Sequence, residues 1–120
     1  MTAGGISIHA VDVASGRPAE GLEVRLLRIS GDMQELLAAG QCGPTGLFDH
    51  PTVRGEGVTE GCYIAQFLVG AFYTANGMNN APPAFLDEVS FQFGVADARQ
   101  HYHLPFKFTA WGYSLFRGGL

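Results

Sequence analysis

The sequence predicts an all-β domain, an antiparallel sandwich or barrel built from short strands. Three observations predict it: apolar residues alternate with polar ones, turn signals separate the alternating segments, and 17 glycines accompany a composition that is 47% apolar and 15% charged. The length of 120 residues is ordinary for one domain. We therefore expect residues 1–120 to form a single domain, and no repeat, linker or low-complexity stretch divides them.

The first strand is expected over residues 6–12. Its alternation places Ile6 and Ile8 on one face and Ser7 and His9 on the other. Further strands are expected at residues 22–29, 34–39, 62–69, 89–95 and 102–110. Turn signals lie at residues 15–18, 30–32, 43–46, 54–57 and 79–83.

The secondary structure of three segments is assigned on other grounds than simple alternation. Residues 62–69 are apolar on both faces, which is typical of a central strand covered on both sides. Residues 34–39 fit a helix as well as a strand, and the turns that flank them closely favour a strand. Residues 70–80 lack alternation, so we expect one short helix there.

Composition excludes several classes of partner. Seven basic and eleven acidic residues give a net charge of −4 without a run of one sign, so a nucleic-acid or anionic-membrane surface is not expected. The apolar stretches fall short of the ~20 residues that span a bilayer. The opening residues lack a secretory pattern, so we expect a cytoplasmic protein in which Cys42 and Cys62 are free, buried thiols.

Three of the four histidines fall on outward strand faces. In residues 102–110 the apolar side chains alternate inward, so His101, His103 and Lys107 point outward. His9 points outward on the first strand by the same argument. A single outward histidine is usually only a solvated side chain, but three together favour a site.

Two chemistries are open to these histidines. His101 and His103 lie two residues apart, roughly 7 Å between Cα atoms, a spacing that permits shared metal ligation with His9, an aspartate or a cysteine. That signal is weak, because H-x-H recurs often. A neutral histidine could instead act as general base towards water, since its ordinary pKa near 6.5 suits that role. No G-x-S-x-G, phosphate-loop or C-x-x-C motif is present.

Three segments resemble a known family. Residues 6–12 have the sequence ISIHAVD followed by GRPA at 16–19, residues 101–110 are HYHLPFKFTA, and residues 112–119 are GYSLFRGG. Together they resemble the transthyretin-like proteins, and within them the bacterial 5-hydroxyisourate hydrolases. The corresponding family motifs are L-S-x-H-V-L-D, G-x-P-A, H-Y-H-x-P-L-L-L-S-P and G-Y-S-T-Y-R-G-S.

The resemblance implies a sandwich of eight strands with one short helix, assembled as a homotetramer, a dimer of dimers. It implies active sites where two dimers meet around a central channel, with His9 and His103 flanking a small-molecule substrate. There water opens the six-membered ring of 5-hydroxyisourate, a step of purine metabolism, without metal or cofactor. Phe116, Arg117 and Gly118 match the tail that lines the channel.

The sequence departs from the family's pattern in one turn. The hydrolases carry D-G-R where this chain has Thr45, Gly46 and Leu47, so a leucine replaces the arginine that would bind the anionic ring. The loss of such a contact is expected to cost about 2–5 kcal/mol. Arg54 or His50, a few residues further on, could supply it instead.

Further departures lie near the same site. Lys107 adds a positive charge at an apolar family position, Gly119 replaces the family's terminal serine, and Phe116 replaces its tyrosine. Because these changes gather at the expected pocket, they favour an altered substrate or an altered activity.

Three functions therefore stay open. The chain is a cyclic amide hydrolase acting on 5-hydroxyisourate, a family enzyme retuned to another small cyclic substrate, or a non-catalytic binder as transthyretin is. Retention of His9 and His103 favours an enzyme in which they are catalytic. The residues expected to contact substrate are Leu47, Arg54, Lys107, Phe116, Arg117 and Gly118.

Overall fold

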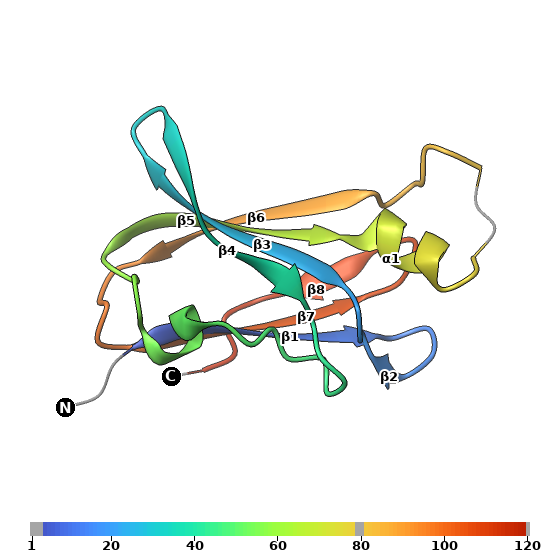
Figure 1. Cartoon of the computed structure of the whole chain (residues 1–120), viewed down its shortest axis with the longest axis horizontal. Helices are drawn as coiled ribbons and strands as arrows, with labels where there is room; N and C mark the ends of the chain where they lie inside the picture. Colours follow the sequence, from blue (N-terminus) through green and yellow to red (C-terminus); the bar gives the residue numbers. More distant parts are fainter. Residues whose placement is uncertain (1–3, 79–80, 120) are drawn as a thin grey trace.

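Two four-stranded sheets form a sandwich in the computed structural model, which describes residues 4–78 and 81–119 (Figure 1). The first sheet has the order β2-β1-β7-β8 and the second the order β4-β3-β5-β6. The predicted all-β sandwich of eight strands with one short α-helix is confirmed in this part of the chain.

Six strands follow the predicted segments closely, whereas the two short strands at residues 17–18 and 113–115 were not predicted, the first of them lying in a predicted turn. The first sheet consists of β1 (Gly5–Asp12), β2 (Arg17–Pro18), β7 (His101–Phe108) and β8 (Tyr113–Leu115). The second consists of β3 (Glu23–Ser30), β4 (Met33–Gln41), β5 (Gly61–Leu68) and β6 (Glu88–Val95). The helices are α1 (Val69–Ala75) and the 3-10 helix η1 (Pro51–Arg54), and no described helix is long and apolar enough to cross a membrane.

Two further features of this topology were not predicted from the sequence. β1 and β7 run parallel, with Gly5 opposite His101 and Asp12 opposite Phe108, whereas only antiparallel neighbours were expected. Alternation within a strand reports which side chains share a face but not the direction of its neighbour, so the sequence held no signal for this pairing. The helix η1 was also missed, although Pro51 at its first position favours a helix start.

The core lies between the sheets and uses the alternate residues predicted to face inward. Phe67 of β5 stacks on Phe106 of β7 with ring centroids 4.0 Å apart, and Phe108 lies 4.8 Å from Phe106. Helix α1 adds Phe72 and Tyr73, whose rings meet Phe108 edge-on at 5.5 and 5.7 Å. Other buried side chains of this core are Ile6, Ile8, Ala10, Leu22, Val24, Leu26, Tyr63, Ala65, Val89, Val95, Tyr102 and Leu104.

The outer face of β5 corrects one prediction about the cysteines. Both thiols are free, and Cys42 is buried, which raises the pKa of its thiol to about 12. Cys62 was expected to be buried but is exposed. The pleat turns Tyr63 into the core, so Cys62 points outward with Ile64, and in a single chain that face is only half-covered.

The aromatic stack between the two sheets predicts how much the free energy of unfolding falls when one of its rings is removed. Phe106 is 0% exposed, so Phe106→Ala should lower the free energy of unfolding by about 3–5 kcal/mol through lost burial and the cavity left behind. Phe85 is 76% exposed and offers a matched control, for which Phe85→Ala should change stability by less than about 1 kcal/mol. Chemical denaturation of both variants measures the difference, and equal losses would contradict this account of the core.

Candidate active site

The outer face of the first sheet gathers the histidines predicted to point outward. The pleat turns Ser7 and His9 of β1 away from the core, together with His101 and His103 of β7. In the parallel register Ser7 lies opposite His103, and His9 lies opposite Pro105. The three histidines are half-buried, so the prediction that they share the outer face is confirmed.

Ser7 joins two of these rings. Its Oγ lies 2.7 Å from Nε2 of His101 and 2.7 Å from Nδ1 of His103. On the far side of His101, Nδ1 lies 3.1 Å from the carbonyl oxygen of Gly4. Sequence analysis had placed Ser7 on the outward face but gave it no role, because its contact with His103 depends on the parallel pairing of β1 and β7.

The turn before η1 holds His9 from the other side. Nε2 of His9 donates to the carbonyl oxygen of Thr45 at 2.8 Å. Gly46 makes this approach possible: its φ is +86°, and a Cβ there would lie 3.3 Å from the ring of His9. Leu47 forms an antiparallel bridge with His9, flanked by hydrogen bonds from Ala10 N to Gly46 O and from Phe48 N to Ile8 O. Side chains of such a pair stand side by side, so Leu47 flanks His9.

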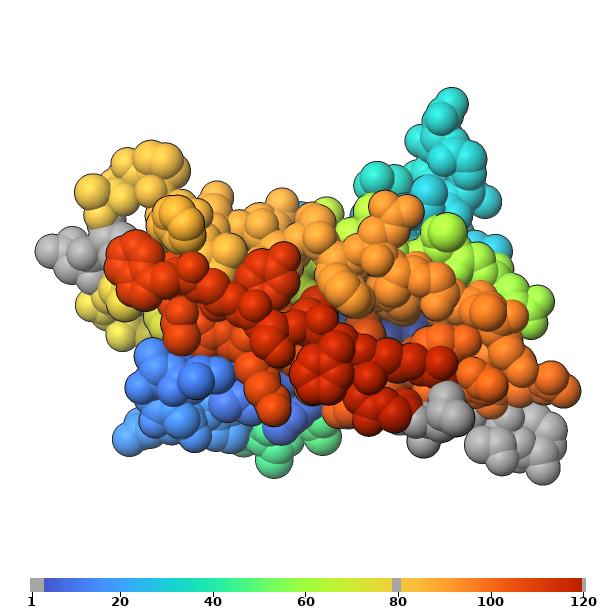
Figure 2. Space-filling view, turned by 180° about the vertical axis from the view of Figure 1, so that it is seen from behind, coloured from blue at the N-terminus to red at the C-terminus, as the bar shows by residue number. Residues whose placement is uncertain are grey.

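The C-terminal tail borders the histidines on the opposite side. β8 pairs with β7 so that Leu115 lies opposite Phe106, and Gly118 N donates to His103 O at 2.7 Å, which continues the same register. This register places Phe116 and Gly118 on the face that carries His103. A Cβ on Gly118 would lie 2.9 Å from the His103 ring, so the tail packs directly against it. Figure 2 shows this segment in red, running along the molecule beside β6 in orange.

Arg117 does not join the histidines. The alternation of the tail turns its side chain to the opposite side, where the guanidinium lies 3.9 Å from the ring centroid of Tyr102. The same group donates to the carbonyl oxygen of His101 and to Oε1 of Gln100, both at 3.1 Å. The prediction that Arg117 contacts substrate therefore finds no support within one chain.

Two further cations were predicted to contact substrate. Lys107 is exposed on the histidine face, as predicted, opposite Val11 and Ser114. Arg54 ends η1 with its side chain 69% exposed and its guanidinium 3.9 Å from the carboxylate of Asp49. The strand register places Lys107 on the face that carries His9 and His103.

His50 was considered as a replacement for the missing arginine, but the contacts of its side chain are with Phe48 and with the start of η1. Its ring stacks on Phe48 at 6.0 Å, and its Nδ1 accepts a hydrogen bond from Thr52 N at the start of η1. With these contacts His50 caps the N-terminus of η1.

The electrostatics of the site favour a neutral histidine. Burial lowers the pKa of His103 below its ordinary value, and the nearby His101 and His9 lower it further because a positive ring disfavours charge on its neighbour. A neutral imidazole accepts a proton from water at neutral pH. Among the described residues no group of three His, Cys, Asp or Glu side chains is arranged to hold a metal ion.

Comparisons with known proteins identify the family. The model of the HIUase/Transthyretin family matches residues 6–118. The chain belongs to this family. It is 38% identical to 5-hydroxyisourate hydrolase 2 of Rhizobium meliloti over 115 residues, 96% of each chain. It is 37% identical to 5-hydroxyisourate hydrolase of Pseudomonas aeruginosa, covering 96% of this chain and 91% of the relative.

Solved structures agree with the family assignment. The 5-hydroxyisourate hydrolase of Klebsiella pneumoniae superposes with a TM-score of 0.77 at 27% identity, covering 97% of this chain and 94% of that one. An (S)-allantoin synthase superposes with a TM-score of 0.88 at 27% identity, covering 98% of this chain but 44% of the other. The resemblance inferred from the sequence motifs is thereby confirmed.

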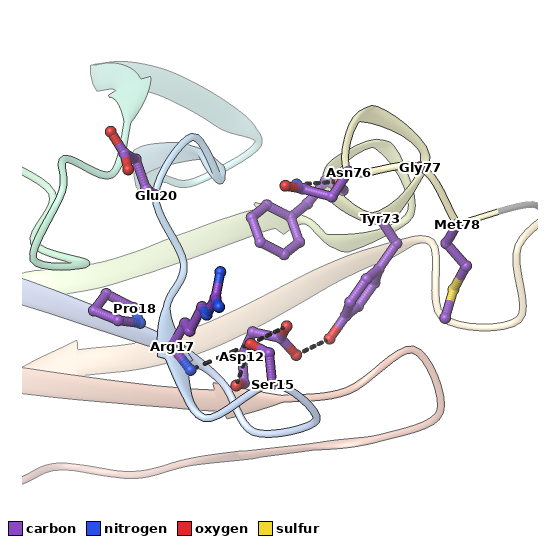
Figure 3. A pocket seen from close by; sticks show the side chains of 10 residues that line it. Asp12, Ser15, Arg17, Pro18, Glu20, Tyr73, Asn76, Gly77 and Met78 are labelled. Carbon is purple, nitrogen blue, oxygen red and sulfur yellow. Dashed lines mark hydrogen bonds between the residues drawn. The ribbon is translucent and has the colours of Figure 1, made fainter.

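A surface cavity of about 720 Å³ lies elsewhere on this HIUase/Transthyretin family member, between α1 and the turn after β1 (Figure 3). There the Tyr73 hydroxyl donates to Asp12 at 2.6 Å, and Ser15 Oγ donates to the same carboxylate at 2.8 Å. Burial, and then the bond and charge of Asp12, raise the pKa of Tyr73. These hydrogen bonds tie the turn after β1 to α1, and none of the histidines lines the cavity.

The charge environment predicts how His103 titrates. Its ring should lose its proton below pH ~6.5, the ordinary value for histidine, and His9→Gln should raise its pKa by removing one positive neighbour. Proton NMR of the ring resonances over a pH series measures both shifts. His50→Gln is the matched control and should leave His103 unchanged. A wild-type midpoint above 6.5 would contradict this description.

Proposed function

We propose that the protein is a cyclic amide hydrolase that opens the ring of 5-hydroxyisourate, with His9 and His103 as its catalytic residues. The observation that carries the proposal is the pair of half-buried histidines on one sheet face, in a chain 37–38% identical to curated 5-hydroxyisourate hydrolases. Strand spacing separates the two residues by about 8 Å at Cα, which leaves room for a small ring between them.

The reaction uses one base and one acid. Neutral His103 takes a proton from water as the water oxygen bonds to the carbonyl carbon of the ring amide. The bond from that carbon to the ring nitrogen then breaks, and the nitrogen receives a proton from the imidazolium form of His9. Exchange with solvent afterwards removes the proton from His103 and restores the one on His9. The lowered pKa of His103 supports its role as the base, because the ring is neutral at the pH where it must act.

A homotetramer, a dimer of dimers with sites where the dimers meet, is part of the proposal. Leu47 and Phe116 flank the histidine face and are each 48% exposed in a single chain. Apolar side chains beside a candidate site are covered when a second subunit packs on that face. Such packing would also exclude water from around His103. The cytoplasmic location stays a prediction.

One observation favours a second candidate, a family enzyme retuned to a less anionic cyclic amide. Leu47 lies beside His9, where a cation would be needed to bind an anionic ring. The two arginines predicted to contact substrate have other partners: the Arg54 guanidinium lies 3.9 Å from the carboxylate of Asp49, and that of Arg117 packs over the ring of Tyr102. Lys107 is the cation that this face retains among the described residues. A non-catalytic binder is less well supported, because it would have no use for a base held neutral.

Hydrolysis of freshly generated 5-hydroxyisourate, followed by its absorbance decay, tests the activity. The wild type should accelerate the decay, and His103→Ala should lower kcat/KM by about 10²–10⁴-fold through loss of the base. His50→Ala, the matched histidine control, should retain wild-type activity. Decay no faster than the uncatalysed rate with wild-type protein would overturn the proposal.

Leu47→Arg separates the two candidate substrates. If the site is retuned, restoring a guanidinium beside His9 should raise kcat/KM on 5-hydroxyisourate by roughly 30- to several-thousand-fold, equivalent to about 2–5 kcal/mol. Leu36→Arg is the control, because Leu36 is exposed on β4 of the other sheet. A fast wild type that gains nothing from Leu47→Arg would rule out the retuned candidate.

A further inference from the structure

We propose that Ser7 and His101 are positioning residues that hold His103 in the tautomer with its free lone pair on Nε2. The inference rests on the proposed function, because it specifies which nitrogen of His103 acts as the base. It concerns Ser7 and His101, neither of which is among the residues expected to be catalytic or to contact substrate, and it follows from a chain of hydrogen bonds that begins at the backbone of Gly4.

The first link fixes the hydrogen on His101. A carbonyl oxygen can only accept a hydrogen bond, so Nδ1 of His101, 3.1 Å from the oxygen of Gly4, carries the hydrogen. In a neutral imidazole the other nitrogen then holds the lone pair. Nε2 of His101 therefore accepts from the Ser7 hydroxyl, 2.7 Å away.

The second link fixes the hydrogen on His103. A serine hydroxyl has one hydrogen, and Ser7 has given it to His101. Its Oγ can then only accept from Nδ1 of His103, which lies 2.7 Å away. Nδ1 of His103 thus carries the hydrogen and Nε2 the lone pair. No hydrogen bond from the described residues occupies Nε2, so that nitrogen is available to a water molecule.

The surroundings of Ser7 make this arrangement stable. Ser7 is 9% exposed, and a hydroxyl this deeply buried is costly to leave without partners. The titratable groups that face His103 are His101 on its own strand and His9 on β1, while the tail contributes the backbone of Gly118. When Nε2 takes a proton, the ring keeps its Nδ1 hydrogen on Ser7 Oγ, so the orientation of His103 is unchanged through the step.

A tautomer is measured directly, without substrate. In protein labelled with 15N-histidine, long-range proton–nitrogen NMR at a pH where the rings are neutral should show the His103 hydrogen on Nδ1. Ser7→Ala removes the acceptor and should shift the population towards a hydrogen on Nε2, whereas Ser7→Thr keeps a hydroxyl and should retain the wild-type pattern. A wild-type His103 with its hydrogen on Nε2 would overturn the inference.

Kinetics provide the second readout. Ser7→Ala should lower kcat on 5-hydroxyisourate by roughly 10²-fold or more with little change in KM, because substrate still binds but the base nitrogen is blocked. Ser30→Ala is the matched control: it removes an exposed serine at the end of β3, in the other sheet, and should leave kcat unchanged. If Ser7→Ala fails to fold, His101→Phe on the half-buried strand surface frees the Ser7 hydrogen and should shift the tautomer in the same direction.

The two proposals fail in different ways. A wild type that shows the expected tautomer but does not hydrolyse 5-hydroxyisourate would refute the substrate and leave the positioning of His103 intact. Rapid hydrolysis by a wild type with the opposite tautomer would refute the roles of Ser7 and His101 alone. A Ser7→Ala variant that loses stability while keeping its tautomer and kcat would assign Ser7 a purely structural role.

Discussion

The parallel pairing of β1 with β7 is the constraint on which the candidate site depends. It brings together residues more than 90 positions apart, so that Ser7 lies opposite His103 and His9 opposite Pro105. An antiparallel arrangement of the same two strands would leave each inward face apolar but would change which polar residues meet. Core formation and site assembly thus make different demands: the core needs the alternation, whereas the site needs the register and direction as well.

The pleat lets β1 and β7 contribute to both the core and the candidate site. The inward side chain of Phe106 on β7 stacks against Phe67 on β5, with their ring centroids 4.0 Å apart. This stacking fixes the position of β7 relative to the second sheet. The outward side chains, His101 and His103, are then carried on a rigid backbone instead of a loop. A base on such a support would lose little orientation by thermal motion, which suits the proposed reaction, in which one ring nitrogen of His103 takes the proton.

Sequence reasoning reached the elements and the faces but not the contacts between distant segments. His9, His103 and Lys107 were placed on outward faces because alternation is a local property that the sequence displays. The contacts of Ser7 and Gly4 with the histidines could not be predicted, since they depend on a pairing that the sequence does not encode locally. Arg117 was expected at the substrate because of its motif, yet the register of the tail turns it towards Tyr102.

Residues near both ends of the described chain form hydrogen bonds with the histidine residues of β7. The carbonyl oxygen of Gly4 accepts from Nδ1 of His101, and Gly118 N donates to the carbonyl oxygen of His103. Figure 1 shows the two ends of the described chain at the same end of the molecule. A purification tag or fusion partner would therefore emerge beside the chemistry whichever terminus carried it. Recombinant protein should be assayed after removal of such additions, so that a blocked site is not mistaken for a missing activity.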